Sequence, residues 1–295
     1  MTDSNESRAP QPSAASRLFL EALKRVWYVI NLPFAIALIL GSSRIHPAYR
    51  VGWFRRVGLG LMMFWNKLRI PTGTSYKAHL AMALKILELP PDLEGDVVEC
   101  GCWKGGSSAN LSLVCRLAGR KLVIYDSFEG LPVPKADDRE GAGYKEGEYC
   151  GTLPEVRANI SRGGALEVCE FVEGWFDKTL PGSTGKIALL FLDVDLEDSL
   201  NTCVKHLWPR LVEGGYLFTD ECVALDYVAL FWSERWWREN FDCTPPGLIG
   251  AGTGLPLGEF YIGPWSERGE HPGQHASTGA YTRKSFSGYW DYYPE

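Results

Sequence analysis

The sequence predicts an α/β fold built on a doubly wound, mostly parallel sheet. Short apolar segments that end in glycine or an acid alternate with segments of helical periodicity. Strands that alternate with helices in this way are typical of parallel sheets with right-handed crossovers. The composition, 45% hydrophobic and 22% charged over 295 residues, is that of a folded chain with a large core. It excludes disorder throughout the chain.

The chain divides into four predicted parts. Residues 1–16 are polar and rich in Ser, Ala and Pro, which predicts a flexible tail. Residues 17–70 form a helical, apolar and basic extension, and residues 71–263 form the α/β domain. Residues 264–295 are polar, contain Gly and Pro, and are expected to be an extended C-terminal tail.

The α/β domain shows a regular succession of predicted elements. The predicted helices are 76–89, 105–118, 153–162, 198–212 and an aromatic-rich helix at about 223–240, and the predicted strands are 96–100, 121–126, 167–172, 187–192, 215–219, 246–250 and 258–262.

Charge is distributed unevenly along the chain. Residues 1–70 carry ten Lys/Arg against three Asp/Glu, whereas 71–295 carry twenty against thirty-three, so the two parts have net charges of +7 and −13. An acidic main domain argues against a groove for nucleic acid, and we expect no nucleic-acid partner. The eight cysteines include no C-x-x-C pair or zinc-type set, which favours a reducing, cytoplasmic location.

The extension contains an apolar run, Val26–Leu40, that is interrupted by Asn31 and Pro33. At 1.5 Å per residue this run is about 22 Å long, which is short of the roughly 30 Å hydrocarbon core of a bilayer. Proline inside a helix also favours a kink. A simple membrane span is therefore not expected.

Aromatic and basic residues are mixed in the rest of the extension. They are Arg44, Arg50, Trp53, Arg55, Arg56, Trp65, Lys67 and Arg69. This mixture is typical of segments that lie on a membrane surface, and two interpretations stay open. Residues 17–70 either contact the inner face of the membrane peripherally, or pack on the core or on a second subunit of a homo-oligomer.

A glycine-rich turn follows the first predicted strand, in the series Glu99-Cys-Gly-Cys-Trp-Lys-Gly-Gly-Ser-Ser. Gly101 and Gly105 allow a ligand to approach the backbone, and the next helix offers free N–H groups to an anion. Asp126 ends the second strand, where an acid can accept hydrogen bonds from ribose hydroxyls. Because the dinucleotide and phosphate-loop spacings are absent, an adenosyl ligand without a pyrophosphate fits better.

Carboxylates follow two later strands. Asp193 follows the apolar strand 187–192, and Asp220-Glu221 follows the next strand, so the fold would bring all three to one rim of the sheet. Such a cluster of hard oxygen donors suits Mg²⁺. Asp195 is an alternative to Asp193 as the residue that contacts the metal and takes the proton, if the chain is still extended at this point. If the strand has ended, Asp195 is expected to cap the next helix.

Five motifs in this order resemble the macrocin O-methyltransferase family over roughly residues 72–262. They are Val97-Val-Glu-Cys-Gly-Cys-Trp-Lys-Gly-Gly-Ser, Asp126-Ser-Phe-Glu-Gly-Leu-Pro, Gly174-Trp-Phe with Thr179-Leu-Pro, Leu192-Asp-Val-Asp-Leu, and Gly214-Gly with Asp220-Glu. The resemblance implies a Rossmann-like class I methyltransferase domain. It also implies S-adenosylmethionine as cofactor, Mg²⁺, and an O-methyltransferase that acts on sugar hydroxyls of natural products.

The resemblance also implies that the metal is held by Asp193, Asp220 and Glu221, although relatives usually have two aspartates where this chain has Asp220-Glu221. From its position at the rim of the sheet, Asp193 is also expected to act as the base that takes the proton of the acceptor hydroxyl. The cofactor residues are expected to be Glu99, Gly101, Trp103, Gly105, Ser107, Asp126, Ser127 and Trp175.

The expected acceptor is a small-molecule or lipid-linked glycoside. Two alternatives stay open: methylation of a catechol-like aromatic diol, which uses the same cofactor and metal, and a non-catalytic adenosyl-binding protein associated with the membrane.

Overall fold

The computed structural model of the chain describes residues 14–134, 144–220, 225–253, 258–262 and 279–284. These residues form an eight-stranded sheet with the strand order β3-β2-β1-β4-β5-β8-β6-β7. Its strands are β1 (Asp96–Cys100), β2 (Leu122–Asp126), β3 (Cys169–Glu173), β4 (Ile187–Leu192), β5 (Leu211–Thr219), β6 (Leu248–Thr253), β7 (Gly258–Ile262) and β8 (Ala280–Arg283).

The five strands from β3 to β5 are parallel, which confirms the predicted doubly wound α/β class. The chain starts at β1 in the middle of this half, moves outward to β2 and β3, and returns to β4 on the other side of β1. The connection after β1 therefore runs toward one edge of the sheet, and the connection after β4 runs toward the other edge, so the strand order reverses between β1 and β4. In open α/β sheets, ligands bind outside the carboxyl ends of the strands at such a point.

The other three strands are antiparallel additions to this sheet. β8 pairs with β5 on one side and with β6 on the other, and β7 pairs with β6. Tyr281 of β8 stacks on Phe218 of β5, with ring centroids 5.1 Å apart. The expectation that residues 264–295 form only a tail is wrong for β8, because four residues carry too little periodicity to be recognised and are stabilised by pairing on both edges.

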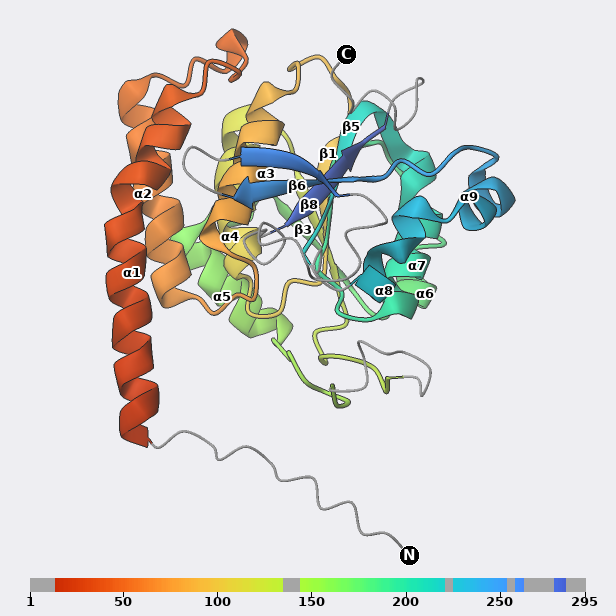
Figure 1. The fold of residues 1–295 in the computed structure, drawn as a ribbon, viewed down its shortest axis with the longest axis horizontal. Helices are drawn as coiled ribbons and strands as arrows, with labels where there is room; N and C mark the ends of the chain where they lie inside the picture. Colours follow the sequence, from red (N-terminus) through yellow and green to blue (C-terminus); the bar gives the residue numbers. More distant parts are fainter. Residues whose placement is uncertain (1–13, 135–143, 221–224, 254–257, 263–278, 285–295) are drawn as a thin grey trace, which may run out of the picture.

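Helices cover both faces of the sheet (Figure 1). Residues of one strand alternate between two apolar clusters: Val97 packs in the cluster with the helices α2 to α5, and Val98 packs in the cluster with α7 and α9. The helices are α1 (Ala14–Gly41), α2 (Trp53–Arg69), α3 (Tyr76–Glu88), α4 (Gly106–Ala118), α5 (Leu153–Gly163), α6 (Phe176–Thr179), α7 (Glu197–Leu207), α8 (Leu225–Val228) and α9 (Glu234–Phe241).

Two predicted helices differ from the observed ones. The helix expected over 198–212 ends at Leu207, because Pro209 cannot continue it and the chain enters β5 at Leu211. The helix expected at about 223–240 is divided into α8, a 3₁₀ turn and α9. Ser233 starts α9 as its N-cap, and its side chain accepts a hydrogen bond from the backbone N–H of Trp236.

The extension forms a helical hairpin of α1 and α2, with α2 between α1 and the domain (Figure 1). Helix α1 is continuous through Pro33. Arg56 of α2 donates hydrogen bonds to the carbonyl oxygens of Leu40 and Ser42, at 3.0 and 3.1 Å. It thus provides a donor for backbone carbonyls at the C-terminal end of α1 that have no partner within the helix. No helix in the described part of the chain is long and apolar enough to cross a membrane.

A buried polar network joins α2 to the domain. Asn66 Nδ2 donates to Asn110 Oδ1 at 2.9 Å and to the carbonyl oxygen of Gly163 at 2.7 Å. Asn110 Nδ2 lies 2.8 Å from His79 Nδ1, and burial, together with the charge of Lys67, lowers the pKa of His79 to about 3. The inner face of α2 therefore packs as part of the domain core, as one of the two interpretations of the extension requires.

Candidate active site

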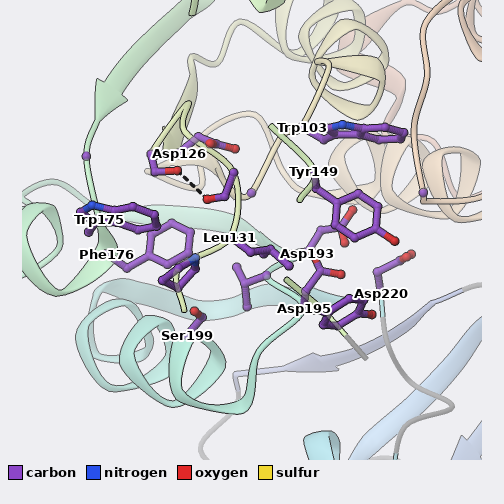
Figure 2. A pocket seen from close by; sticks show the side chains of 18 residues that line it. Trp103, Asp126, Leu131, Tyr149, Trp175, Phe176, Asp193, Asp195, Ser199 and Asp220 are labelled. Atoms are coloured by element: carbon purple, nitrogen blue, oxygen red, sulfur yellow. Dashed lines mark hydrogen bonds between the residues drawn. The ribbon is translucent and has the colours of Figure 1, made fainter. Parts of the chain in front are cut away.

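The carboxyl ends of the parallel strands surround a pocket of about 210 Å³. Of the predicted site residues, Gly101, Trp103, Asp126, Ser127, Trp175, Asp193 and Asp220 line it, together with the competitor Asp195. Figure 2 shows Asp126, Trp175 and Phe176 on one side of the pocket and the three later carboxylates on the other. The pocket is thus where the reversal of strand order predicts a ligand site.

Gly101 brings the ends of β1 and β4 together. Its φ of +81° favours glycine, and a Cβ at this position would lie 1.9 Å from the carbonyl oxygen of Asp193. The backbone N–H of Gly101 donates to the carbonyl of Tyr125, and that of Asp193 donates to the carbonyl of Cys100. The chain's own backbone thus requires this glycine, and the close approach places Asp193 beside the turn.

The next two glycines of the turn face other parts of the protein. A Cβ on Gly105 would lie 3.0 Å from Val156 Cγ1, and one on Gly106 would lie 2.7 Å from Thr72 Cβ. Gly105 is not among the described residues that line the pocket. The structure shows a packing role for Gly105, and its predicted contact with a cofactor stays a prediction.

Asp126 ties the turn after β1 to the turn after β2. Its Oδ2 accepts a hydrogen bond from the N–H of Cys102, and its Oδ1 accepts one from the N–H of Phe128, both at 2.7 Å. A carboxylate oxygen has two lone pairs, so each oxygen can accept a further hydrogen bond from a ligand hydroxyl. Ser127 donates to the carbonyl of Gly130 at 2.9 Å and lines the pocket beside Asp126.

Aromatic and apolar side chains form much of the pocket wall. Trp175 and Phe176 lie at the start of α6, and Trp103 meets Tyr149 edge to face with ring centroids 5.4 Å apart. Backbone hydrogen bonds hold residues 144–149 against Leu131, whose N–H donates to Glu148 and whose carbonyl accepts from Gly147. Such flat apolar surfaces suit an adenine or a sugar ring.

Sequence reasoning did not place Leu131 or Phe176 in the site. Both stand within the five motifs, Leu131 in Asp126-Ser-Phe-Glu-Gly-Leu-Pro and Phe176 in Gly174-Trp-Phe, but an apolar side chain there does not by itself indicate a ligand contact. Leu131 is held at the pocket by backbone hydrogen bonds with Gly147 and Glu148, and the sequence carries no short-range signal for that pairing.

Three carboxylates, Asp193, Asp195 and Asp220, line the opposite wall. Burial and the negative charges of Asp193 and Asp195 raise the pKa of Asp220 well above its usual range. Asp195 has a left-handed φ of +58°, and the N-cap of α7 is Leu196, without a side-chain cap bond. Asp195 lines the pocket beside Asp193, and the choice between the two as base stays open on geometry.

A threonine and a lysine outside the predicted set support this wall. Thr74, fully buried, donates from Oγ1 to Asp193 Oδ2 at 2.8 Å. Lys67 of α2 donates from Nζ to the carbonyl of Thr74 at 2.7 Å, and its charge opposes the rise in the pKa of Asp220. Lys67 was identified only as part of a basic surface segment; the structure places it behind the acidic wall, where its charge offsets the carboxylates.

Glu99 and Ser107 lie behind the pocket and are not among its described lining residues. Burial raises the pKa of Glu99 to about 8, against the lowering effect of hydrogen bonds from the hydroxyls of Ser107 and Ser108. Ser108 Oγ lies 2.6 Å from Glu99 Oε2. The predicted contact of Glu99 and Ser107 with the cofactor stays a prediction.

The predicted metal ligands are described only in part, because Glu221 lies outside the described residues. Among the residues that are described, no three His, Cys, Asp or Glu side chains form a group that could hold a metal ion. Asp193 and Asp220 nevertheless provide two oxygen donors in one pocket. Mg²⁺ commonly uses one or two carboxylates and completes its shell with water and substrate oxygens, so this donor chemistry fits it.

The strand order and the pocket at the strand ends are those of a class I methyltransferase. A solved structure, the O-methyltransferase NovP, is similar with a TM-score of 0.53 and 21% sequence identity, covering 88% of this chain and 99% of that chain. Residues 74–245, more than half of the chain, match the macrocin-O-methyltransferase (TylF) family. The chain belongs to this family, as the motifs predicted.

Three relatives share part of their length with this chain. A 4'-O-methyltransferase of 8-demethyl-8-(2,3-dimethoxy-alpha-L-rhamnosyl)-tetracenomycin-C from Streptomyces olivaceus is 39% identical over 49% of this chain and 62% of its own. Demethyldecarbamoylnovobiocin O-methyltransferase from Streptomyces niveus is 30% identical over 65% of this chain and 79% of its own. Mycinamicin III 3''-O-methyltransferase from Micromonospora griseorubida is 31% identical over 43% of this chain and 55% of its own.

Proposed function

We propose that the protein is an S-adenosylmethionine-dependent O-methyltransferase that methylates a sugar hydroxyl of a glycosylated natural product or glycolipid. The observation that carries this proposal is the meeting of Asp126 and Asp193 in one pocket at the strand ends. All three relatives are named as O-methyltransferases, and one is named for a rhamnosyl compound. These names support a sugar acceptor over a catechol.

The chain's own residues fit an adenosyl cofactor. S-adenosylmethionine would supply the methyl group, carried on a positively charged sulfur. Asp126 has lone pairs left for ribose hydroxyls, and Trp103 and Trp175 offer apolar surface beside it. The three carboxylates on the other wall give the pocket a negative charge, which favours a cationic ligand.

Asp193 is the proposed base. The hydrogen bond from Thr74 holds Asp193 Oδ2 in place, and the backbone contact with Gly101 sets the position of its main chain. A carboxylate oriented in this way can take the proton of a sugar hydroxyl as that oxygen attacks the methyl group. Asp195 lines the same pocket and is the competing candidate for this step.

Asp193, Asp220 and Glu221 are the proposed ligands of Mg²⁺. When bound, the metal would lower the pKa of a coordinated sugar hydroxyl, which by itself is too weak an acid for a carboxylate to deprotonate. The longer arm of Glu221, compared with the aspartate usual in relatives, makes it the weakest of the three proposed ligands. The Glu221→Asp variant is therefore expected to retain or improve metal affinity.

Calorimetry with S-adenosylhomocysteine, followed by methyl-transfer assays on a panel of glycosides and catechols, tests the proposal. We expect binding that Asp126→Ala weakens at least tenfold, and transfer to glycosides that a chelator abolishes. Absence of cofactor binding at millimolar ligand contradicts the enzyme assignment, and full activity in excess chelator contradicts the role of the metal.

The expected homo-oligomer stays a prediction that a single chain does not test. The expected location at the inner face of the membrane also stays a prediction.

A further inference from the structure

Exposed apolar side chains are concentrated on the α1–α2 hairpin. Eleven of the thirteen large hydrophobic side chains that are exposed among the described residues lie on these two helices, and they are 42–84% exposed. They are Leu18, Phe19, Leu23, Val26, Val29 and Ile30 of α1 and Trp53, Phe54, Leu61, Met62 and Trp65 of α2. We call these residues the outer face of the hairpin. Such a collection exceeds the scattered apolar residues of an ordinary surface and marks an interaction site.

A groove of about 560 Å³ lies in this face between the two helices. Every residue that lines it is glycine or apolar: Val29, Leu32, Gly58, Leu61, Met62, Phe64, Trp65 and Leu68. The opposite side of α2 is already occupied by the domain core, through Met63 and the network around Asn66. The outer face is therefore a second apolar surface on the same helix, directed away from the core.

The charge of the hairpin decides which partner fits this face. Residues 14–70 contain nine Lys/Arg and one acid, Glu21, so the segment carries a net charge of +8. Arg50, Arg55 and Arg69 are exposed, and the Arg69 guanidinium lies 4.2 Å from the centre of the exposed Trp65 ring. A second copy of the chain would bring two sets of exposed arginines together, whereas an anionic surface complements them.

We propose that the outer face docks on an anionic lipid surface, with α1 lying in the plane of the interface. Helix α1 has 28 residues and is about 42 Å long, and its apolar side chains would enter the boundary between headgroups and acyl chains. The exposed arginines and tryptophans of α2 would lie at the level of the headgroups, where amphipathic side chains are favoured.

Docking in this way would hold the domain, and its pocket with it, at the lipid surface. The N-terminal half of α1 projects past the domain at the same end of the molecule as the β2–α5 connection (Figure 1). That connection contributes Leu131 and Tyr149 to the pocket wall. If the proposed methyltransferase function holds, a lipid-linked glycoside in the membrane surface is the acceptor class that this arrangement favours.

Flotation of the full chain with vesicles tests the docking. We expect the protein to float with vesicles that contain 30% phosphatidylglycerol in phosphatidylcholine, and to float less as salt rises or when phosphatidylcholine is used alone. The double substitution Phe54→Ser and Trp65→Ser is expected to reduce the bound fraction at least tenfold. Arg50→Gln and Arg55→Gln should each weaken binding about fivefold, because the attraction of one basic side chain to an anionic surface changes the binding constant by about that factor.

One substitution on the domain is the matched control for the arginine variants. Lys178 of α6 carries a 77% exposed side chain, so Lys178→Gln removes a positive charge from another surface and should leave flotation unchanged. Sedimentation equilibrium of the same variants reports whether the face holds a second copy.

Three results would overturn the docking proposal. They are failure of the full chain to float with anionic vesicles at any salt, flotation of the outer-face variants that equals that of the wild type, and a dimer that Phe54→Ser and Trp65→Ser convert to monomer without vesicle binding. Calorimetric cofactor binding is independent of all three, so failure of the docking and failure of the methyltransferase assignment are distinguished.

Discussion

The strand-end pocket and the outer face of the α1–α2 hairpin differ in what holds them in place. Backbone hydrogen bonds between neighbouring strands position the pocket: Asp193 is bonded to the end of β1, and the N–H of Asp220 donates to the carbonyl of Leu192. The outer face is apolar and lies on a hairpin whose net charge is positive, whereas the pocket wall is acidic. The side chains of the outer face are exposed on helices whose other side packs inward. A site preorganised by the chain itself suits chemistry, whereas an exposed apolar face suits a partner outside the chain.

Helix α2 belongs to both regions. Asn66 and Lys67 lie on its inner side and bond to the domain, whereas Met62 and Trp65 lie on its outer side. The two functions are therefore separable by substitution on one helix, and the comparison can be tested residue by residue.

The largest effect is expected for the base. Asp193→Asn keeps the shape of the side chain and removes its charge and basicity, so we expect methyl transfer to fall about 10³-fold. Cofactor affinity should change only a few-fold, because Asp126 is on the other wall. Single-turnover assays and calorimetry measure the two quantities. A loss with Asp195→Asn that exceeds the loss with Asp193→Asn would reassign the base.

The backbone approach that builds the pocket should be sensitive to one methyl group. Gly101→Ala would place a Cβ 1.9 Å from the Asp193 carbonyl at a φ of +81°, and we expect it to lower the free energy of unfolding by about 3 kcal/mol. Gly119→Ala is the matched control: φ is +68°, but nothing lies within 4 Å, so a loss of about 1 kcal/mol is expected from the backbone alone. Urea unfolding measures both variants. If Gly101→Ala and Gly119→Ala lower the free energy of unfolding equally, the close approach of Gly101 to Asp193 does not contribute to stability.

The two sides of α2 should respond differently. Asn66→Ala leaves buried partners, Asn110 and the Gly163 carbonyl, without their hydrogen bonds, and should cost about 2 kcal/mol of unfolding free energy. Met62→Ser on the outer side should change it by less than about 0.5 kcal/mol. If Met62→Ser destabilises the monomer as much as Asn66→Ala, the outer face is part of the core and the comparison fails.

The smallest effect is expected for the positioning residue of the pocket. Thr74→Val removes the hydrogen bond to Asp193, and we expect kcat to fall about tenfold with little change in the KM for cofactor. Thr74→Ser keeps a hydroxyl at this position and should restore most of the rate. Loss of activity in both variants, or a change in KM alone, would indicate a structural role for Thr74.

Several elements could be predicted from residues close together in the chain. The strand Ile187–Leu192 is a continuous apolar run, and it was placed correctly because a strand buried on both faces requires such a run. Asp126, Asp193 and Asp220 were placed in the site because the residue that ends or follows a parallel strand falls at the carboxyl rim of the sheet.

Other features depend on contacts between distant segments. Thr74 bonds to a residue 119 positions further along the chain, and the Lys67 contact with Thr74 shows only when α2 packs on the domain. The strand β8 is recognised by its pairing with β5 and β6 and not by its own four residues.

The sequence by itself determined the α/β class, the glycine turn, the order of the acids and the basic, apolar character of residues 17–70, because these are properties of local periodicity and composition. Only the tertiary structure decided that Gly105 packs on α5, that Asp195 lines the pocket, and that α2 has one face in the core and one face exposed. The physical reason is that burial and hydrogen bonding between segments far apart in the chain are set by packing, which local patterns do not encode.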